Sequence, residues 1–214
     1  MRPVIILFAK APRPGHVKTR LQRRLGAVGA AALHQAFTLD MLETLLSLEG
    51  VDVELHTDIA TDAWRAANVS PRLQSSGDLG IRMYQALSLA IASGHPLAMI
   101  VGSDAPDLPA GHITAMLGSE SDVSLGPSED GGYWSIACRR THPEMFRGVV
   151  WSQSTTLDET LAACARCGLS TSLGPAWRDV DEWSDVLRLC RTMILPRHTR
   201  EWLNQSGVAR DEVE

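Results

Sequence analysis

A group of basic side chains near the N-terminus could bind phosphate. The apolar residues 4–8 predict a strand buried on both faces, and a loop containing prolines follows it. This loop and the residues just after it contain Lys10, Arg13, Gly15, Lys18 and Arg20. A glycine lets the backbone approach a ligand closely, and Lys and Arg donate hydrogen bonds to phosphate oxygens. The spacing matches neither the Walker motif nor G-x-G-x-x-G, so a solvated basic loop is the alternative.

Carboxylates that could hold a metal ion follow a later apolar run. Residues 97–101 predict a short buried strand, and Asp104 and Asp107 come soon after it. A carboxylate in that position could bind Mg²⁺ or Mn²⁺ while a diphosphate supplies further oxygens. The structural alternatives are that Asp104 caps a turn and that Asp107 starts the next helix.

A third polar loop lies between two expected strands, at residues 123–125 and 133–137. It contains Asp130, Gly131 and Gly132, and Tyr133 follows it. Acidic residues, glycines and an aromatic residue together predict a loop that faces a ligand, not a tight hairpin. A simple reverse turn is the alternative.

A fourth group of carboxylates lies at Asp179 and Asp181. Side chains two residues apart in an extended segment point to the same side, so both could face one metal ion together with Asp104. Alternatively, Asp181 caps the helix that the sequence predicts from about residue 182 to residue 190.

The elements between these loops alternate between strands and helices. Residues 28–48 predict a long helix, residues 51–55 a strand, and Asp78 the N-cap of a helix that ends at Gly94. This alternation predicts a single α/β domain with a mostly parallel, doubly wound sheet. In such sheets ligands bind beyond the carboxyl ends of the strands, where most of the polar loops would lie.

Composition excludes several classes of function. The chain has 214 residues and a formal net charge of -5 without a long basic run, which argues against binding nucleic acid. No apolar stretch approaches the roughly 18 residues that span a bilayer. We therefore expect a cytoplasmic protein that does not bind membranes. The sequence does not indicate its oligomeric state.

In their order along the chain, these loops resemble a bacterial family of glycosyltransferases. The family has the GT-A (nucleotide-diphospho-sugar transferase) fold, and gene context links some members to arsenosugar biosynthesis. The resemblance covers the chain to about Leu189. It rests on Phe8-Ala9-Lys10-Ala11-Pro12-Arg13-Pro14-Gly15, Val17-Lys18-Thr19-Arg20-Leu21, Gln74, Gly77-Asp78-Leu79-Gly80, Arg82-Met83, Gly102-Ser103-Asp104-Ala105-Pro106-Asp107-Leu108, Leu125-Gly126-Pro127, Glu129-Asp130-Gly131-Gly132-Tyr133, Trp151-Ser152 and Asp179-Val180-Asp181. The chain is more distantly similar to nucleotidylyltransferases such as phospholactate guanylyltransferase, through its Lys-Thr-Arg-Leu segment.

The resemblance implies a fold and a role for each loop. It predicts a GT-A-like three-layer α/β/α domain at residues 1–195, followed by a C-terminal helix and tail at 196–214. The expected phosphate and nucleotide residues are Lys10, Arg13, Gly15, Lys18, Arg20, Gly77 and Asp78. The expected sugar or acceptor residues are Gly131, Gly132, Tyr133 and Trp151. Asp104 and Asp181 would bind Mg²⁺ or Mn²⁺, although the segment around Asp104 lacks the two-acid Asp-x-Asp of many GT-A enzymes.

The main hypothesis is a metal-dependent glycosyltransferase that uses a nucleoside-diphosphate sugar and a small-molecule acceptor. Lys18 and Arg20 would stabilise the leaving diphosphate, and Asp130 would be the base that activates the acceptor hydroxyl. The first alternative is a nucleotidylyltransferase that joins a nucleoside triphosphate to a phosphorylated small molecule and releases pyrophosphate. The second alternative is a nucleotide-binding regulatory protein without catalysis.

Overall fold

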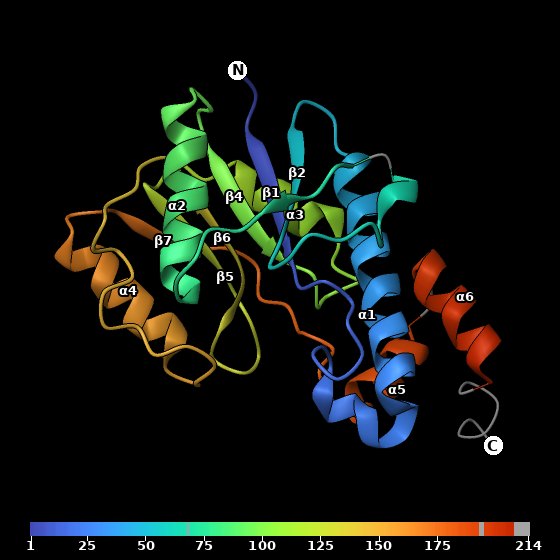
Figure 1. Ribbon diagram of the computed structural model, residues 1–214. Coiled ribbons are helices and arrows are strands. Elements are labelled where there is room, and N and C mark those ends of the chain that lie inside the picture. The colour runs from blue at the N-terminus through green and yellow to red at the C-terminus, as the bar shows by residue number, and fades with distance from the viewer. Residues whose placement is uncertain (68, 193–194, 208–214) are drawn as a thin grey trace.

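The protein is built around one seven-stranded sheet between helices (Figure 1). The computed structural model describes residues 1–67, 69–192 and 195–207. The strands stand in the order β3-β2-β1-β4-β6-β5-β7. They are β1 (Val4–Ala9), β2 (Asp52–Thr57), β3 (Arg72–Leu73), β4 (Ala98–Gly102), β5 (Val123–Pro127), β6 (Tyr133–Cys138) and β7 (Thr171–Leu173).

The sheet is mostly parallel, as predicted. Only β6 runs against its neighbours: it pairs antiparallel with β4 and with β5, whereas the other pairs are parallel. In β1, Val4 to Leu7 are all buried, which confirms a strand covered on both faces. The carboxyl ends of β1 and β4 lie side by side because Phe8 pairs with Gly102.

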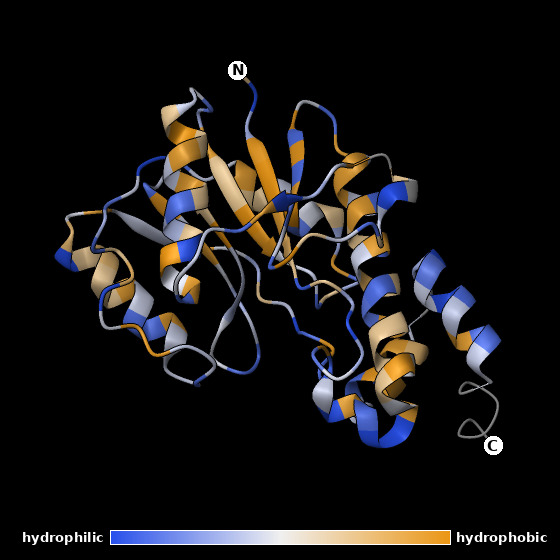
Figure 2. Ribbon diagram, viewed as in Figure 1, coloured by the Kyte–Doolittle hydropathy of each residue, from blue (hydrophilic) through white to orange (hydrophobic). Residues whose placement is uncertain are grey.

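Helices cover both faces of the sheet. They are α1 (Gln22–Leu46), α2 (Leu79–Ala92), α3 (Ala110–Leu117), α4 (Thr156–Arg166), α5 (Trp183–Cys190) and α6 (Arg197–Ser206). Alternate side chains of β1 separate the two cores, since Ile5 packs with Met41 of α1 and Ile6 packs with Met83 of α2. Figure 2 shows apolar strands in the centre of the molecule and helices that carry both apolar and polar residues around them.

A third apolar cluster joins the C-terminal helices to α1. Leu33 and Phe37 of α1 pack with Leu189 of α5 and Leu203 of α6. The helix expected after residue 196 is therefore present, and the tail at 208–214 lies outside the described residues.

The observed elements differ from the predicted ones mainly at their ends. The helix expected at residues 28–48 starts at Gln22, before a non-helical Gly26 at φ 66°, and ends at Leu46. The two-residue strand β3 was not predicted, because a strand this short has no readable alternation. Within the described part of the chain, every helix is too short or too polar to cross a bilayer. The cytoplasmic location stays a prediction.

Candidate active site

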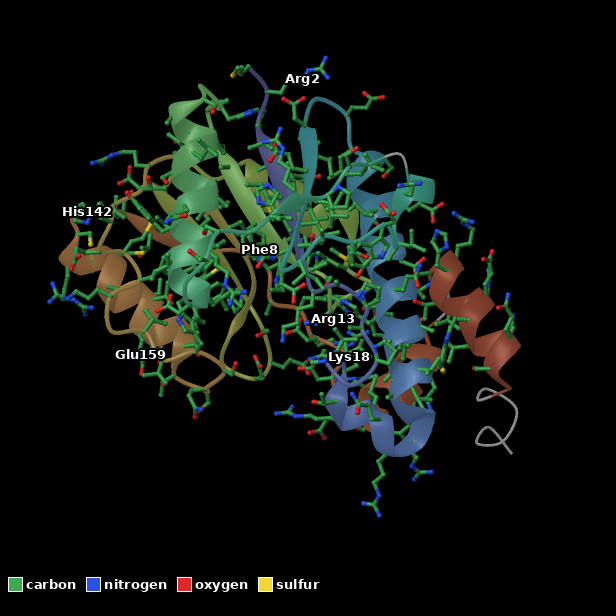
Figure 3. The ribbon with its side chains drawn as sticks, in the orientation of Figure 1. Arg2, Phe8, Arg13, Lys18, His142 and Glu159 are labelled. Carbon is green, nitrogen blue, oxygen red and sulfur yellow. The ribbon has the colours of Figure 1, made fainter. Side chains whose placement is uncertain are left out.

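A basic cleft of about 530 Å³ opens at the carboxyl ends of β1 and β4. Its lining includes four cationic side chains and two carboxylates: Lys10, Lys18, Arg20, Arg82, Asp104 and Asp181. Most of these residues come from segments that directly follow a strand, which explains why residues far apart in sequence meet here. Figure 3 shows Lys18 and Arg13 in the loop beside α1, with Phe8 nearer the centre of the molecule.

Lys18 is held in the basic cleft by its backbone conformation and by three polar contacts. Its backbone is left-handed (φ 44°, ψ 46°), which is uncommon for a residue other than glycine. Its ammonium lies 2.7 Å from Oδ1 of Asp104 and 2.9 Å from Oδ1 of Asp181. It also donates a hydrogen bond of 2.7 Å to the carbonyl of Val180. The Lys18 side chain is only 4% exposed, whereas the two carboxylates are 43% and 44% exposed.

Charge attraction overcomes burial at this cluster. Burial alone would lower the pKa of Lys18, but Asp104 and Asp181 raise it above its ordinary value. Burial alone would raise the pKa of Asp104, but the ammonium of Lys18 holds it below its ordinary value. Both carboxylates thus face a cation in the protein without ligands.

His34 supports the cluster from α1 and was not predicted. Its Nδ1 lies 3.9 Å from Oδ1 of Asp104, and its Nε2 is 2.8 Å from the carbonyl oxygen of Lys10. Burial lowers the pKa of His34, which favours the neutral ring. No sequence signal marked it, because a histidine among apolar helix residues has the pattern of an ordinary core position.

An acidic cleft of about 370 Å³ adjoins the basic cleft. Phe8, Arg20, Leu79, Gly102, Asp104, Ser152 and Asp181 line both clefts. The acidic cleft adds Asp130 and Asp179, so four carboxylates face it beside a single cationic side chain, Arg20. Its aromatic lining consists of Phe8, Tyr133, Trp134 and Trp151.

The loop after β5 forms one wall of the acidic cleft. It is closed by hydrogen bonds from the amide of Ser128 to the carbonyl of Gly132 and from the amide of Gly131 to the carbonyl of Ser128. It is therefore a tight hairpin, contrary to our prediction, although Ser128, Asp130 and Gly132 still line the cleft. Asp130 accepts hydrogen bonds from the hydroxyl of Ser128 and the amide of Gly132.

Gly131 joins this hairpin to the loop before α4. Its φ is 85°, and a Cβ atom there would overlap the backbone of Ser154. Its carbonyl accepts a hydrogen bond from the amide of Leu157. Gly131 itself is not among the residues that line the cleft, so its part in the site is to let two walls meet.

The surroundings of Asp179 shift its pKa strongly. Burial, together with the negative charges of Asp104 and Asp181, raises its pKa to about 7. Asp179 and Asp181 both line the acidic cleft, in agreement with the predicted alternation, and Asp181 also contacts Lys18, which was not predicted. The N-cap of α5 is Glu182, so the alternative role of Asp181 as that cap is wrong.

Some predicted residues lie at the margins of the clefts. Neither cleft is lined by Arg13, Gly15, Gly77 or Asp78. Asp78 caps α2 by accepting a hydrogen bond of 2.8 Å from the amide of Ile81, which confirms the predicted N-cap. The carbonyl of Gly77 instead accepts a bond from Arg82, which does line the basic cleft.

Tyr133 and Trp151, both predicted near the sugar or acceptor, line the acidic cleft. Burial raises the pKa of the Tyr133 hydroxyl.

Asp107 does not start α3, which begins at Ala110. It pairs instead with Arg178 at 2.7 Å.

A second group of possible metal ligands lies outside both clefts. Side-chain atoms of Asp40, Glu43 and His198 lie within 4.8 Å of one another. The two oxygens of Asp40 already accept hydrogen bonds from the amides of His198 (2.7 Å) and Thr199 (2.8 Å) at the start of α6. This geometry makes Asp40 a cap for α6 that is supplied by α1.

Known proteins share this fold and this sequence pattern. A 2-phospho-L-lactate guanylyltransferase from Methanoculleus marisnigri is 28% identical over 207 residues, which cover 94% of this chain and 89% of that protein. A crystal structure from Desulfovibrio desulfuricans G20, provisionally assigned as a nucleotide-diphospho-sugar transferase, has a TM-score of 0.87 at 30% identity and covers 97% and 96% of the two chains. A cytidylyltransferase from Leptospira borgpetersenii has a TM-score of 0.58 at 12% identity, covering 100% and 98%, and shows the fold alone.

These likenesses confirm the predicted α/β fold of nucleotide-diphospho-sugar transferases. They place the chain in the superfamily that contains both nucleotidyltransferases and glycosyltransferases. A family model for uncharacterized proteins conserved in bacteria matches residues 32–153. The chain therefore belongs to this bacterial family, DUF2064.

Proposed function

We propose that the protein is a metal-dependent nucleotidylyltransferase. The observation that carries this proposal is the cationic lining of the basic cleft: Lys10, Lys18, Arg20 and Arg82 surround a space next to Asp104 and Asp181. A triphosphate needs several cations and a divalent metal to offset its charge. The chain as a whole has a net charge of -5, yet these four cationic side chains lie together at one edge of its sheet.

Asp104 and Asp181 suit a hard divalent cation. They present carboxylate oxygens, the ligands that Mg²⁺ prefers, and they already converge on the ammonium of Lys18. When bound there, Mg²⁺ or Mn²⁺ would supply charge neutralisation at the phosphates. Asp40, Glu43 and His198 are less suitable, because Asp40 is occupied as a helix cap.

The proposed reaction is an attack by a phosphate oxygen of the acceptor on the α-phosphorus of the nucleoside triphosphate. A new P–O bond forms, the bond between the α-phosphorus and the α–β bridging oxygen breaks, and its electron pair leaves with pyrophosphate. Lys10, Lys18 and Arg82 stabilise the charge on the leaving pyrophosphate. Arg20 lines both clefts and can hold the acceptor phosphate beside them. The acceptor oxygen is already ionised, so this reaction needs no general base.

The sequence relative from Methanoculleus supports this reaction, since its name is that of a guanylyltransferase. GTP is therefore the first nucleotide to test. The acidic cleft, with Trp134 and Trp151 in its wall, would hold the uncharged part of the acceptor.

Glycosyl transfer is the second candidate, and two observations favour it. Four carboxylates and several aromatic rings line the acidic cleft, and such groups suit the hydroxyls and faces of a sugar. The similar Desulfovibrio structure is also named for a sugar transferase. In this reaction the acceptor is a hydroxyl, and Asp130 would accept its proton.

Product analysis separates these reactions. The protein is incubated with Mg²⁺ and each nucleoside triphosphate with phosphorylated hydroxy acids or sugar phosphates, and separately with nucleoside-diphosphate sugars and unphosphorylated acceptors. Pyrophosphate release that depends on the acceptor supports nucleotidyl transfer, whereas nucleoside diphosphate release supports glycosyl transfer. Nucleotide binding without either product would contradict both and favour a regulatory protein.

A further inference from the structure

The ammonium of Lys18 stands where the proposed metal ligands converge. Its three contacts, to Asp104, Asp181 and the carbonyl of Val180, measure 2.7, 2.9 and 2.7 Å. An ammonium has three N–H donors, so these contacts use its full capacity. The carboxylates thus already have a cation as their partner before any metal is present.

We propose that Lys18 competes with the metal ion for Asp104 and Asp181 and releases them when nucleotide phosphates bind, so that metal and nucleotide bind cooperatively. This inference rests on the proposed function, because it takes the two carboxylates as the metal ligands. Lys18 thereby acts as a positioning residue for the metal as well as a ligand for phosphate.

Electrostatics makes the two cations mutually exclusive. A divalent ion on these half-exposed oxygens would lie against the buried ammonium of Lys18, and like charges in contact repel. Lys18 therefore has to move or the metal has to be excluded. Without another anion nearby, moving a buried ammonium away from both carboxylates would leave it unpaired, which is costly.

The phosphates of a nucleotide provide the alternative partner. Lys18 lines the basic cleft, so its ammonium can turn from the carboxylates to phosphate oxygens in the same cavity. The backbone of Lys18 is left-handed, and the ring centroid of Phe37 lies 5.6 Å from its ammonium, beside the end of the side chain. Only the end of the side chain needs to move.

The opposing possibility is that Lys18 is a permanent structural tie. In that case its ion pairs simply hold the segment around Val180 against the loop before α1. Loss of the ammonium would then weaken the site and would not improve metal binding.

The test measures Mn²⁺ binding without nucleotide, by the electron paramagnetic resonance signal of free Mn²⁺. Lys18→Met removes the ammonium and keeps an apolar stem. We expect it to bind Mn²⁺ at least about tenfold more tightly than the wild-type protein, the smallest effect expected from a charge in direct contact. Lys18→Arg keeps the charge and should bind Mn²⁺ as weakly as wild type.

The chain offers a matched control in Lys10, its only other lysine. Lys10 lines the same cleft and is exposed, and Lys10→Met removes the same charge. Its effect on Mn²⁺ affinity should stay within about twofold, because an exposed charge is screened. Equal affinities for Lys18→Met and Lys10→Met, or weaker binding by Lys18→Met, would overturn the proposal.

A second measurement needs no variant and decides the matter if Lys18→Met does not fold. Labelling with ¹⁵Nζ-lysine gives two side-chain signals, for Lys10 and Lys18. Mg²⁺ with a non-hydrolysable GTP analogue should shift the Lys18 signal strongly, while equal Mg²⁺ alone leaves it in place. A shift of the Lys10 signal without a shift of the Lys18 signal would refute the movement of Lys18 from the carboxylates to the phosphates. The proposed function would still stand. If neither signal moves with any nucleotide, the proposed function fails, and the Mn²⁺ comparison still tests the competition.

Discussion

The basic and acidic clefts share a border but differ in charge. Both are lined by Arg20, Asp104 and Asp181, yet the basic cleft adds lysines and an arginine whereas the acidic cleft adds Asp130 and Asp179. A ligand that spans them would place its phosphates on one side and its uncharged, hydroxyl-bearing part on the other. The transfer reaction would then take place at the border between the clefts, where Asp104 and Asp181 contact Lys18.

Replacing Asp104, one of the two carboxylates that line both clefts, should have the largest effect on activity. Asp104→Asn removes a proposed metal ligand and a partner of Lys18. Changes to groups that only support a metal ligand cost about 10- to 100-fold, so loss of a ligand should lower kcat/KM at least about a hundredfold. Steady-state rates across a Mg²⁺ series measure this. Asp158→Asn, an exposed change on α4, is the control, and wild-type turnover by Asp104→Asn would refute the assignment.

Asp130→Asn should affect glycosyl transfer and nucleotidyl transfer to different extents. A hydroxyl acceptor needs a base, and loss of a general base costs about a hundredfold or more. A phosphate acceptor needs none, so nucleotidyl transfer should change only modestly. The measurement compares rates of pyrophosphate and nucleoside diphosphate release by this variant and by wild type. A hundredfold loss of pyrophosphate release would contradict the proposed nucleotidyl mechanism.

Gly131→Ala should separate the two walls of the acidic cleft. The new Cβ atom would overlap the backbone of Ser154 at a position whose φ is 85°. Strain of this kind costs about 1–3 kcal/mol, which urea denaturation can measure as a lower free energy of unfolding. We expect KM to rise for the acceptor more than for the nucleotide. Gly111→Ala in α3 is the control, since its Cβ atom would meet no neighbour, and an equal loss there would argue against this explanation.

Asp179 should produce a smaller effect that depends on pH. Its pKa is about 7 in the folded protein against an ordinary value of 3.8, so the folded state binds its proton more tightly. This contribution to the free energy of unfolding is present below about pH 4 and is lost as the pH rises through about 7. Asp179→Asn should therefore gain stability relative to wild type as the pH rises, by about 1 kcal/mol or more at pH 8. Denaturation curves from pH 4 to 8 test this, and a constant difference would contradict it.

Local patterns in the sequence predicted many of the strands and helices that surround these clefts. The apolar run of β1 and the cap at Asp78 depend on nearby residues, and both are observed. The reversed direction of β6 and the pairing of Asp107 with Arg178 depend on contacts between distant segments, which no local pattern contains.

The site itself could be predicted only as a set of loops. Their polar residues marked the carboxyl edge of the sheet, since parallel strands bring such loops together. The left-handed turn at Lys18 and the burial of His34 arise only in the folded chain, so the ion pairs of Asp104 were not foreseen.

We expect a metal–nucleotide complex to bind where the two clefts meet. A crystal structure with Mn²⁺ and a non-hydrolysable GTP analogue would locate both ligands, because anomalous scattering identifies the Mn²⁺ ion. We expect an anomalous peak at Asp104 and Asp181, with phosphates on the side of Lys10 and Arg82. A peak at Asp40, Glu43 and His198, or nucleotide bound outside the basic cleft, would contradict it.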